Sequence, residues 1–238
     1  MQTLGIIGSG NIGSAIARLA VAANIPVVVS NSRGPETLTD LVQELGPLAS
    51  AGTVEDAAAA SDTVVLSVPL PASMSIPADL LAGKVVLDTG NYYPFRDGRI
   101  RELDAEEFTA GELVQRHFAG ARLVKAFSNI LAHHIPQLAR PADAPDRTAL
   151  PIASDHEDAK VAAQTLMDQL GFDTVDAGAL SEAWRFEPES AAYTRLYLAD
   201  PSTPMDQMMT APASPTPASE LTSVLEGADR VRVAEREF

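Results

Sequence analysis

The chain has 238 residues, enough for one large or two small domains, and its 17 lysines and arginines against 32 aspartates and glutamates give a formal net charge of −15. So acidic a chain argues against nucleic acid or an anionic membrane as a general partner. The absence of cysteine excludes disulfides, thiolate catalysis and cysteine-ligated metal.

The first elements of the chain predict a dinucleotide-binding βαβ unit. Residues 3–7 and 26–30 are apolar runs typical of strands, and residues 14–23 favour a helix. The sequence shows no signal peptide with a basic region and an apolar region, and no apolar run long enough to span a membrane. We therefore expect a cytoplasmic protein. The turn between the first strand and the helix is a G-x-G-x-x-G made of Gly8, Ser9, Gly10, Asn11, Ile12 and Gly13.

Each glycine of this turn has a physical role. Gly8 lets the chain leave the strand in a tight turn, and Gly13 lets the helix pack closely on the strand. Gly10 has no side chain to hold a pyrophosphate away from the backbone. The N-terminus of the following helix then offers unpaired N–H groups to the phosphates.

The end of the second strand predicts which dinucleotide binds. A ribose with a free 2′-OH usually meets an Asp or Glu about 20 residues after the glycines. Here Ser30 is followed by Asn31, Ser32 and Arg33, and the first carboxylate is Glu36. Hydroxyls and a guanidinium hold a 2′-phosphate that a carboxylate would repel. We therefore predict NADP(H).

The remaining elements continue the alternation of strands and helices. Strands are expected over 48–53, 63–68, 84–88, 121–127, 149–153 and 172–176. Helical segments are expected over 36–45, 54–60, 78–81, 112–119, 129–139, 157–170 and, with a break near Pro188, 180–198. The pattern predicts an α/β fold of the Rossmann type, with a doubly wound, mainly parallel sheet and a C-terminal helical segment.

The composition changes after residue 198. Residues 199–219 are rich in proline and resemble a linker, and a short helix is expected over 219–227. We expect one NADP-binding oxidoreductase domain over 1–198, in which about 148–198 form a small C-terminal part. Residues 199–238 then form a tail that is either flexible or packed on a partner subunit.

These segments together carry a family resemblance. Residues 3–198 resemble the deazaflavin (F420)-dependent NADP oxidoreductase family, to which the NADPH-binding domain of the STEAP ferric reductases is related. The resemblance lies in Gly8 to Gly13, Asn31-Ser32-Arg33, Ser67-Val68-Pro69, Val124 to Asn129, Leu150 to Asp155 and Val175 to Ser181.

The resemblance implies hydride transfer between NADP(H) and a deazaflavin or flavin-type carrier, with the two rings stacked in a cleft. The hydride moves directly, so catalysis consists of positioning and the exclusion of water. The resemblance also implies a homodimer. The acidic charge and the lack of a membrane-spanning run predict no nucleic acid and no membrane partner. The residues then expected at the cofactor are the six of the glycine turn together with Asn31, Ser32, Arg33, Thr37, Ser67, Val68, Pro69, Gly90, Asn91 and Ala126.

The chain departs from the family pattern at two positions. Thr37 stands where the family often has a second basic residue for the phosphate, which predicts a weaker phosphate preference. Ser128 stands where members of the family tend to carry a histidine near the deazaflavin. The identity of the ring carrier, deazaflavin or flavin, therefore stays open.

Several polar side chains are candidates for chemistry. Asn91 and Asn129 follow strand ends, where either side chain is able to bond a carboxamide or a flavin edge, or only to cap a loop. His133-His134 resembles a metal or proton-transfer pair, but adjacent helix residues point about 100° apart, so we favour a helix-face pair and expect no metal. Lys125 is either a proton donor or a solvated lysine.

Aromatic residues gather in two segments. Tyr92, Tyr93 and Phe95 suit stacking on a flat ring, although a packed loop uses such residues too. Trp184-Arg185-Phe186 forms either one wall of the cleft or part of the core.

Three functions remain open at this point. The first is NADP-dependent hydride exchange with a ring carrier. The second is NADPH-dependent reduction of a small carbonyl or imine, which needs a proton donor such as Lys125, Tyr92 or Tyr93. The third is an NADPH-binding sensor or assembly module without turnover, for which the Pro-rich tail is the hint.

Overall fold

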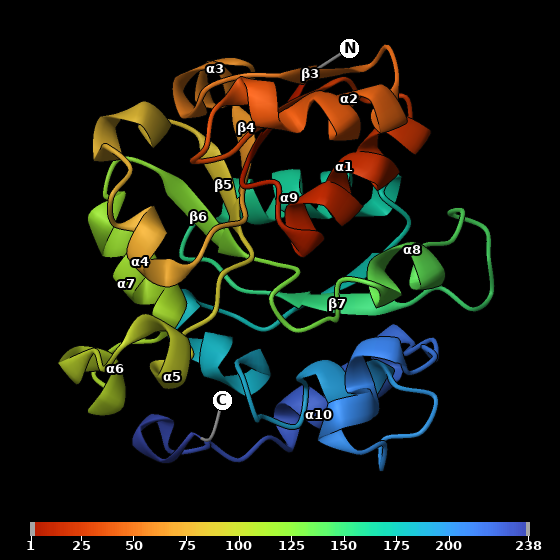
Figure 1. Cartoon of the computed structure of the whole chain (residues 1–238). Coiled ribbons are helices and arrows are strands. Elements are labelled where there is room, and N and C mark those ends of the chain that lie inside the picture. Colours follow the sequence, from red (N-terminus) through yellow and green to blue (C-terminus); the bar gives the residue numbers. More distant parts are fainter. Residues whose placement is uncertain (1–2, 237–238) are drawn as a thin grey trace.

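The computed structural model describes residues 3–236 and contains one six-stranded parallel sheet and one two-stranded parallel sheet (Figure 1). The strands of the large sheet are β1 (Leu4–Ile7), β2 (Val27–Ser30), β3 (Ala49–Ala51), β4 (Thr63–Leu66), β5 (Val85–Asp88) and β6 (Arg122–Lys125). Their spatial order is β3-β2-β1-β4-β5-β6, so the order reverses beside β1. The predicted doubly wound fold is confirmed, and the reversal places the carboxyl ends of β1 and β4 next to each other.

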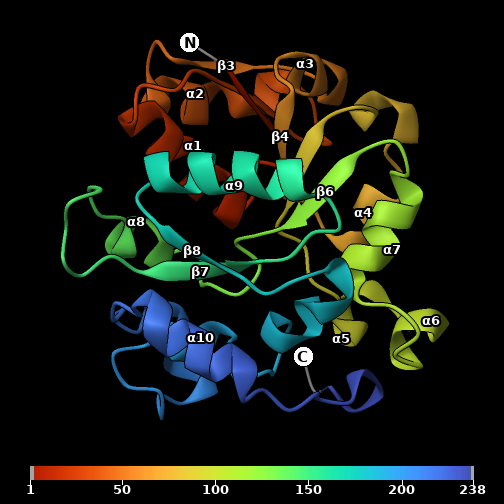
Figure 2. The ribbon, with the colours of Figure 1, turned by 180° about the vertical axis from the view of Figure 1, so that it is seen from behind.

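Helices cover both faces of this sheet. The α-helices are α1 (Asn11–Ala22), α2 (Thr39–Leu45), α3 (Val54–Ala59), α4 (Leu70–Ser73), α5 (Pro94–Asp97), α6 (Arg101–Asp104), α7 (Ala110–His117), α8 (His134–Leu138), α9 (Glu157–Gln169) and α10 (Ala218–Glu226). One buried cluster joins the sheet to α1, α8 and α9, and a second joins its other face to α3 and α7. In the rear view α9 lies across the sheet (Figure 2).

Short 3₁₀ helices complete the chain. They are η1 (Pro35–Leu38), η2 (Ala78–Leu81), η3 (Leu180–Phe186), η4 (Thr194–Tyr197), η5 (Met205–Thr210) and η6 (Val233–Glu235). None of the helices between residues 3 and 236 has the length and apolar character needed to cross a membrane.

The strands of the second half form their own small sheet. β7 (Ala149–Ile152) pairs in parallel with β8 (Asp173–Asp176), and α9 connects them. An antiparallel bridge between Lys125 and Ala153 joins this pair to the end of β6. The small sheet therefore lies at the carboxyl edge of the large sheet.

Two helix predictions were wrong in part. The helix expected over 129–139 exists only from His134, because Phe127 adopts a left-handed backbone with φ 56° and Asn129 bonds elsewhere in the core. The segment expected as helix over 180–198 contains only η3 and η4. Tertiary hydrogen bonds outweigh helix propensity in both places.

The described part of the tail packs on the same chain. Leu221 and Leu225 of α10, the helix expected over 219–227, are buried with Ala149 of β7 and Phe186 of η3. Farther along, a guanidinium nitrogen of Arg236 lies 3.0 Å from a carboxylate oxygen of Glu187, and both side chains are buried. The division at residue 198 stays a prediction, but the tail to residue 236 is part of the packed structure.

Candidate cofactor-binding cleft

A cavity of about 450 Å³ opens at the carboxyl ends of the central strands. Three parts of the chain contribute to its wall: the start of α1, the segments after β4, β5 and β6, and residues near η4 and η5. Its lining residues are Gly10, Asn11, Ile12, Ser67, Val68, Pro69, Thr89, Gly90, Asn91, Tyr93, Arg96, Phe127, Ser128, Ile130, Leu131, Ala132, Tyr193, Thr194 and Met209. The cavity is where the fold rule for open α/β sheets expects a ligand.

The three glycines of the turn have different surroundings. A Cβ at Gly8, where φ is +111°, would lie 2.1 Å from the carbonyl oxygen of Ser67, and a Cβ at Gly13 would lie 2.0 Å from that of Gly8. A Cβ at Gly10 would meet nothing within 4 Å. Gly8 and Gly13 are therefore required by the fold, whereas Gly10 leaves open space at the N-terminus of α1.

Asn31 ties the glycine turn to the loop after β2. Its amide nitrogen donates to Ser9 Oγ at 3.3 Å and to Thr37 Oγ1 at 2.9 Å, and its Oδ1 accepts from the backbone N–H of Arg33 at 2.9 Å. Thr37 Oγ1 in turn donates to the Gly34 carbonyl at 2.8 Å. These bonds hold the loop beside the N-terminus of α1.

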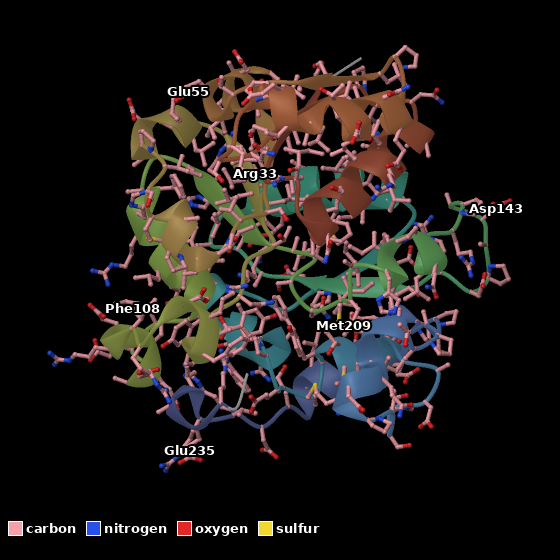
Figure 3. All side chains as sticks on the ribbon, viewed as in Figure 1. Arg33, Glu55, Phe108, Asp143, Met209 and Glu235 are labelled. Atoms are coloured by element: carbon pink, nitrogen blue, oxygen red, sulfur yellow. The ribbon has the colours of Figure 1, made fainter. Side chains whose placement is uncertain are left out.

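Arg33 is exposed, and within residues 3–236 its guanidinium has neither a hydrogen-bond nor an ion-pair partner. In Figure 3, Arg33 lies within the N-terminal part of the molecule and Met209 lies on the C-terminal part. Ser32 is exposed beside it. A free cation, exposed hydroxyls and no carboxylate at the end of β2 fit a dinucleotide with a 2′-phosphate.

A buried ion pair fixes the segment after β5. Lys125 Nζ lies 2.8 Å from Asp88 Oδ2 and also donates to the carbonyl of Gly90, while Asp88 Oδ1 accepts from the Gly90 N–H at 3.0 Å. Lys125 has no exposed surface and does not line the cavity. Lys125 is therefore neither solvated nor a donor in the cleft, and both readings of this lysine from the sequence were wrong.

Asn91 and Ser128 line the cavity, and each has an unpaired polar atom. Asn91 Nδ2 donates to the carbonyl of Ser128 at 2.6 Å. Asn91 Oδ1 and Ser128 Oγ are buried and have no hydrogen-bond partner in the described chain. Because buried polar atoms are rarely left unpaired, these two atoms are suited to bind a ligand.

Asn129, the other asparagine candidate, forms its hydrogen bonds within the buried core. Its Nδ2 donates to the carbonyl of Ala192 and to the hydroxyl of Tyr197, both at 2.8 Å, and it does not line the cavity. Burial raises the pKa of Tyr197, so that hydroxyl keeps its proton and donates to the Ala149 carbonyl at 3.2 Å. Ala126, which was expected at the cofactor, is fully buried and does not line the cavity.

One aromatic residue of the 92–95 segment lies in the cleft. The hydroxyl of Tyr93 hydrogen-bonds to that of Tyr193 and accepts from Asn91 Nδ2 at 3.3 Å, while the Arg96 guanidinium lies 4.6 Å from the centre of the Tyr93 ring. Burial is the main cause that raises the pKa of Tyr193. Tyr92 points elsewhere, and its hydroxyl bonds Asp104.

Sequence reasoning missed part of the wall. It did not assign Arg96, Tyr193 or Met209 to the site, although Arg96 lies in a segment rich in aromatic and basic residues. Tyr193 and Met209 lie in 3₁₀ and irregular chain far along the sequence, where no motif points to a cleft. Only the tertiary packing brings them to the strand ends.

The other singled-out residues lie outside the cleft. The Nε2 atoms of His133 and His134 are each 3.0 Å from the Ala211 carbonyl, and the segment from Leu180 to Phe186 packs beside α7 and α10. A larger cavity of about 700 Å³ lies at the opposite edge of the sheet, between α9 and the starts of β1 and β4. No residue predicted for the cofactor lines that cavity.

Comparisons with known proteins point in one direction. A family model described as NADP oxidoreductase, coenzyme F420-dependent, matches residues 3–92. An F420-dependent NADP reductase from Methanothermobacter thermautotrophicus is 31% identical over 199 residues, which cover 77% of this chain and 83% of that protein.

Solved structures show the same likeness. A hypothetical protein from Sinorhizobium meliloti has a TM-score of 0.67 and 33% identity, with 77% of this chain and 88% of that chain covered. A protein from Arthrobacter sp. FB24, described as a candidate F420-dependent NADP reductase, has a TM-score of 0.65 and 24% identity, with 77% and 87% covered. The second likeness supports the fold alone.

Proposed function

This chain belongs to the F420-dependent NADP oxidoreductase family, and we propose that its cleft exchanges hydride between NADP(H) and a deazaflavin carrier of the F420 type, or a related flavin. The chain is an NADP-dependent oxidoreductase. The carrier is the part of the proposal that needs a test.

The observation that carries the proposal is that one cavity joins a phosphate-type site to an aromatic wall. Gly10 opens the N-terminus of α1 at one end, and Phe127, Tyr193 and Met209 line the same cavity farther on. Helix N-termini bind phosphate, and aromatic or apolar side chains bind flat rings. Such a wall suits two flat rings in contact.

Different residues of the chain are assigned to different parts of the bound ligands. We assign Arg33 to the 2′-phosphate, with Asn31 and Thr37 holding its loop, and the N–H groups after Gly10 to the pyrophosphate. NADPH bound there supplies a hydride, and NADP⁺ accepts one. Asn91 Oδ1 and Ser128 Oγ, which have no other partner in the described chain, are assigned to the ring substituents.

A spectroscopic assay tests this function. The protein is mixed with NADPH and, separately, oxidised F420, FMN or FAD, and the absorbance of both partners is followed. The proposal expects loss of NADPH together with reduction of a deazaflavin or flavin. Binding of NADPH with no oxidation by any of the three carriers would reject the ring carrier and leave a carbonyl or imine acceptor and the binding-module hypothesis.

A small carbonyl or imine is a second candidate acceptor. The observation that favours it is the Tyr93 hydroxyl, a proton donor that lines the cavity. NADPH oxidation by a cyclic imine or a small ketone, with no turnover of F420 or FMN, would select this function instead.

The homodimer implied by the resemblance also remains a proposal. Light scattering coupled to size-exclusion chromatography measures it directly. The expected mass is twice that of the 25.1 kDa chain.

A further inference from the structure

We propose that Tyr93 is a catalytic proton donor to the acceptor, so that the cleft delivers a proton together with the hydride. This inference rests on the proposed oxidoreductase function and adds a residue to it. Tyr93 is the tyrosine of the 92–95 segment that lines the cavity, and its hydroxyl bonds Tyr193 and Asn91.

The hydrogen bonds around Tyr93 leave its proton for a ligand. An amide nitrogen only donates, so the bond from Asn91 Nδ2 takes one lone pair of the Tyr93 oxygen. Tyr193 is only 9% exposed, and its hydroxyl has the Tyr93 oxygen as its hydrogen-bond partner. When Tyr193 donates that bond, the Tyr93 oxygen accepts twice and its own O–H is left free for a ligand of the cavity that Tyr93 lines.

Two charged side chains lie close to Tyr93. The Arg96 guanidinium lies over the ring at 4.6 Å and also donates to the Asn91 carbonyl at 2.9 Å. Asp97 balances part of this charge, since it pairs with Arg96 at 2.7 Å and accepts from the Tyr93 backbone N–H at 3.0 Å. The positive charge of Arg236 also acts on Tyr193, the hydrogen-bond partner of Tyr93, where it lowers the pKa against the effect of burial.

The step balances as follows for an acceptor with a C=N or C=O bond. The hydride that NADPH supplies forms the new C–H bond, and the π electrons of the acceptor move to its nitrogen or oxygen. The Tyr93 O–H bond then breaks, its proton joins that atom, and the electron pair stays on the phenolate. Water that enters after product release restores the proton, and the two hydrogen bonds to the Tyr93 oxygen stabilise the phenolate meanwhile.

The geometry also defines the acceptor class. The site suits acceptors that gain a proton as well as a hydride. Imines and carbonyls gain the proton on the atom bonded to the reduced carbon, whereas a deazaflavin gains it on a ring nitrogen conjugated with the carbon that takes the hydride. A flavin takes both on ring nitrogens.

The variant Tyr93→Phe tests the assignment in the full chain. We expect kcat to fall by about 100-fold with the carrier that the wild type reduces, because general acid catalysis is worth at least about that factor. The Kd of the oxidised carrier, titrated by absorbance with NADP⁺ present so that no turnover occurs, should rise roughly 2- to 12-fold for one lost hydrogen bond. The affinity for NADP⁺ should stay unchanged.

Tyr92→Phe is the matched control, because it removes a neighbouring hydroxyl that bonds Asp104 and the Ile100 N–H outside the cavity. It should keep the wild-type kcat, pH profile and carrier affinity. Tyr193→Phe should give a smaller fall in kcat than Tyr93→Phe, since it removes only the bond that orients the proton.

The outcomes separate this inference from the proposed function. Wild-type reduction of a carrier, with unchanged kcat, pH profile and carrier Kd in Tyr93→Phe, would overturn the role of Tyr93 and leave the proposed function standing. A wild type that neither binds nor reduces F420, a flavin, an imine or a carbonyl would overturn both.

Discussion

Lys125 on β6 and Asp88 on β5 face each other across neighbouring strands, with their charged atoms 2.8 Å apart and both side chains buried. Asp88 and Lys125 each also bond the backbone of Gly90, next to the cleft residue Asn91. The ion pair is therefore part of the frame that holds the segment after β5 at the cavity.

Breaking this pair should destabilise the protein. Lys125→Met leaves the Asp88 carboxylate buried without its cation, which costs about 3–5 kcal/mol. Asp88→Asn leaves the ammonium without its partner and should cost a similar amount. Urea unfolding measures both, and the double variant should lose clearly less stability than the sum of the single variants. Additive losses would contradict a direct interaction between the two charges.

Gly10→Ala and Gly13→Ala should separate binding from folding. A Cβ at Gly10 has open space, so Gly10→Ala should cost less than about 1 kcal/mol of stability, yet it should weaken NADP⁺ binding at least tenfold because the Cβ meets the pyrophosphate. A Cβ at Gly13 meets the Gly8 carbonyl at 2.0 Å, so Gly13→Ala should lower stability by about 1–3 kcal/mol or prevent folding. Thermal unfolding measures the stability of both variants, and a fluorescence titration with NADP⁺ measures their affinity for the dinucleotide.

Arg33→Ala should weaken NADPH binding far more than NADH binding. A charge-assisted bond to the 2′-phosphate contributes about 1.5–3 kcal/mol, or roughly 10- to 150-fold in affinity. The control is Arg18→Ala, which removes an equal charge from α1 where the arginine pairs with Glu44. Equal losses for the two dinucleotides would mean that Arg33 does not contact the phosphate.

The stability of the protein should fall below about pH 6.5. Burial lowers the pKa of His134 in the folded protein, and its Nε2 must carry a hydrogen because it donates to the Ala211 carbonyl. The unfolded chain binds a proton near pH 6.5, so the stability from neutral His134 is complete above that pH and is lost as the pH falls below it.

His134→Gln is the variant that checks this pH dependence, since glutamine also donates to a carbonyl but does not titrate. Unfolding by urea is measured in steps from about pH 8 to 5. The variant should lose less stability than the wild type over the acidic half of that range. Parallel curves for the two proteins would exclude His134 as the source.

Much of the N-terminal fold was predictable from sequence. Strands of a parallel sheet are buried on both faces and appear as continuous apolar runs, so Val27–Ser30 and Val85–Asp88 stand out. The glycine turn then fixes the first βαβ unit. The residues of the turn and of the loop after β2 lie together because these elements are adjacent in sequence.

The far wall of the cleft was not predictable in this way. Tyr93 and Tyr193 meet across a separation of 100 residues, and Met209 reaches the cavity from η5. Asn129, expected in a helix, instead bonds the Ala192 carbonyl in the core. Such contacts depend on tertiary packing, which leaves no local pattern in the sequence.

The most direct test of the account is the fate of the nicotinamide hydrogen. The protein is incubated with oxidised F420 and NADPH that is deuterated at the transferred position of C4, and the reduced carrier is analysed by mass spectrometry. Direct transfer in one cleft predicts deuterium on the carbon of the reduced deazaflavin, with NADH a poorer donor than NADPH. Reduced carrier without deuterium, or no reduced carrier at all, would contradict the account.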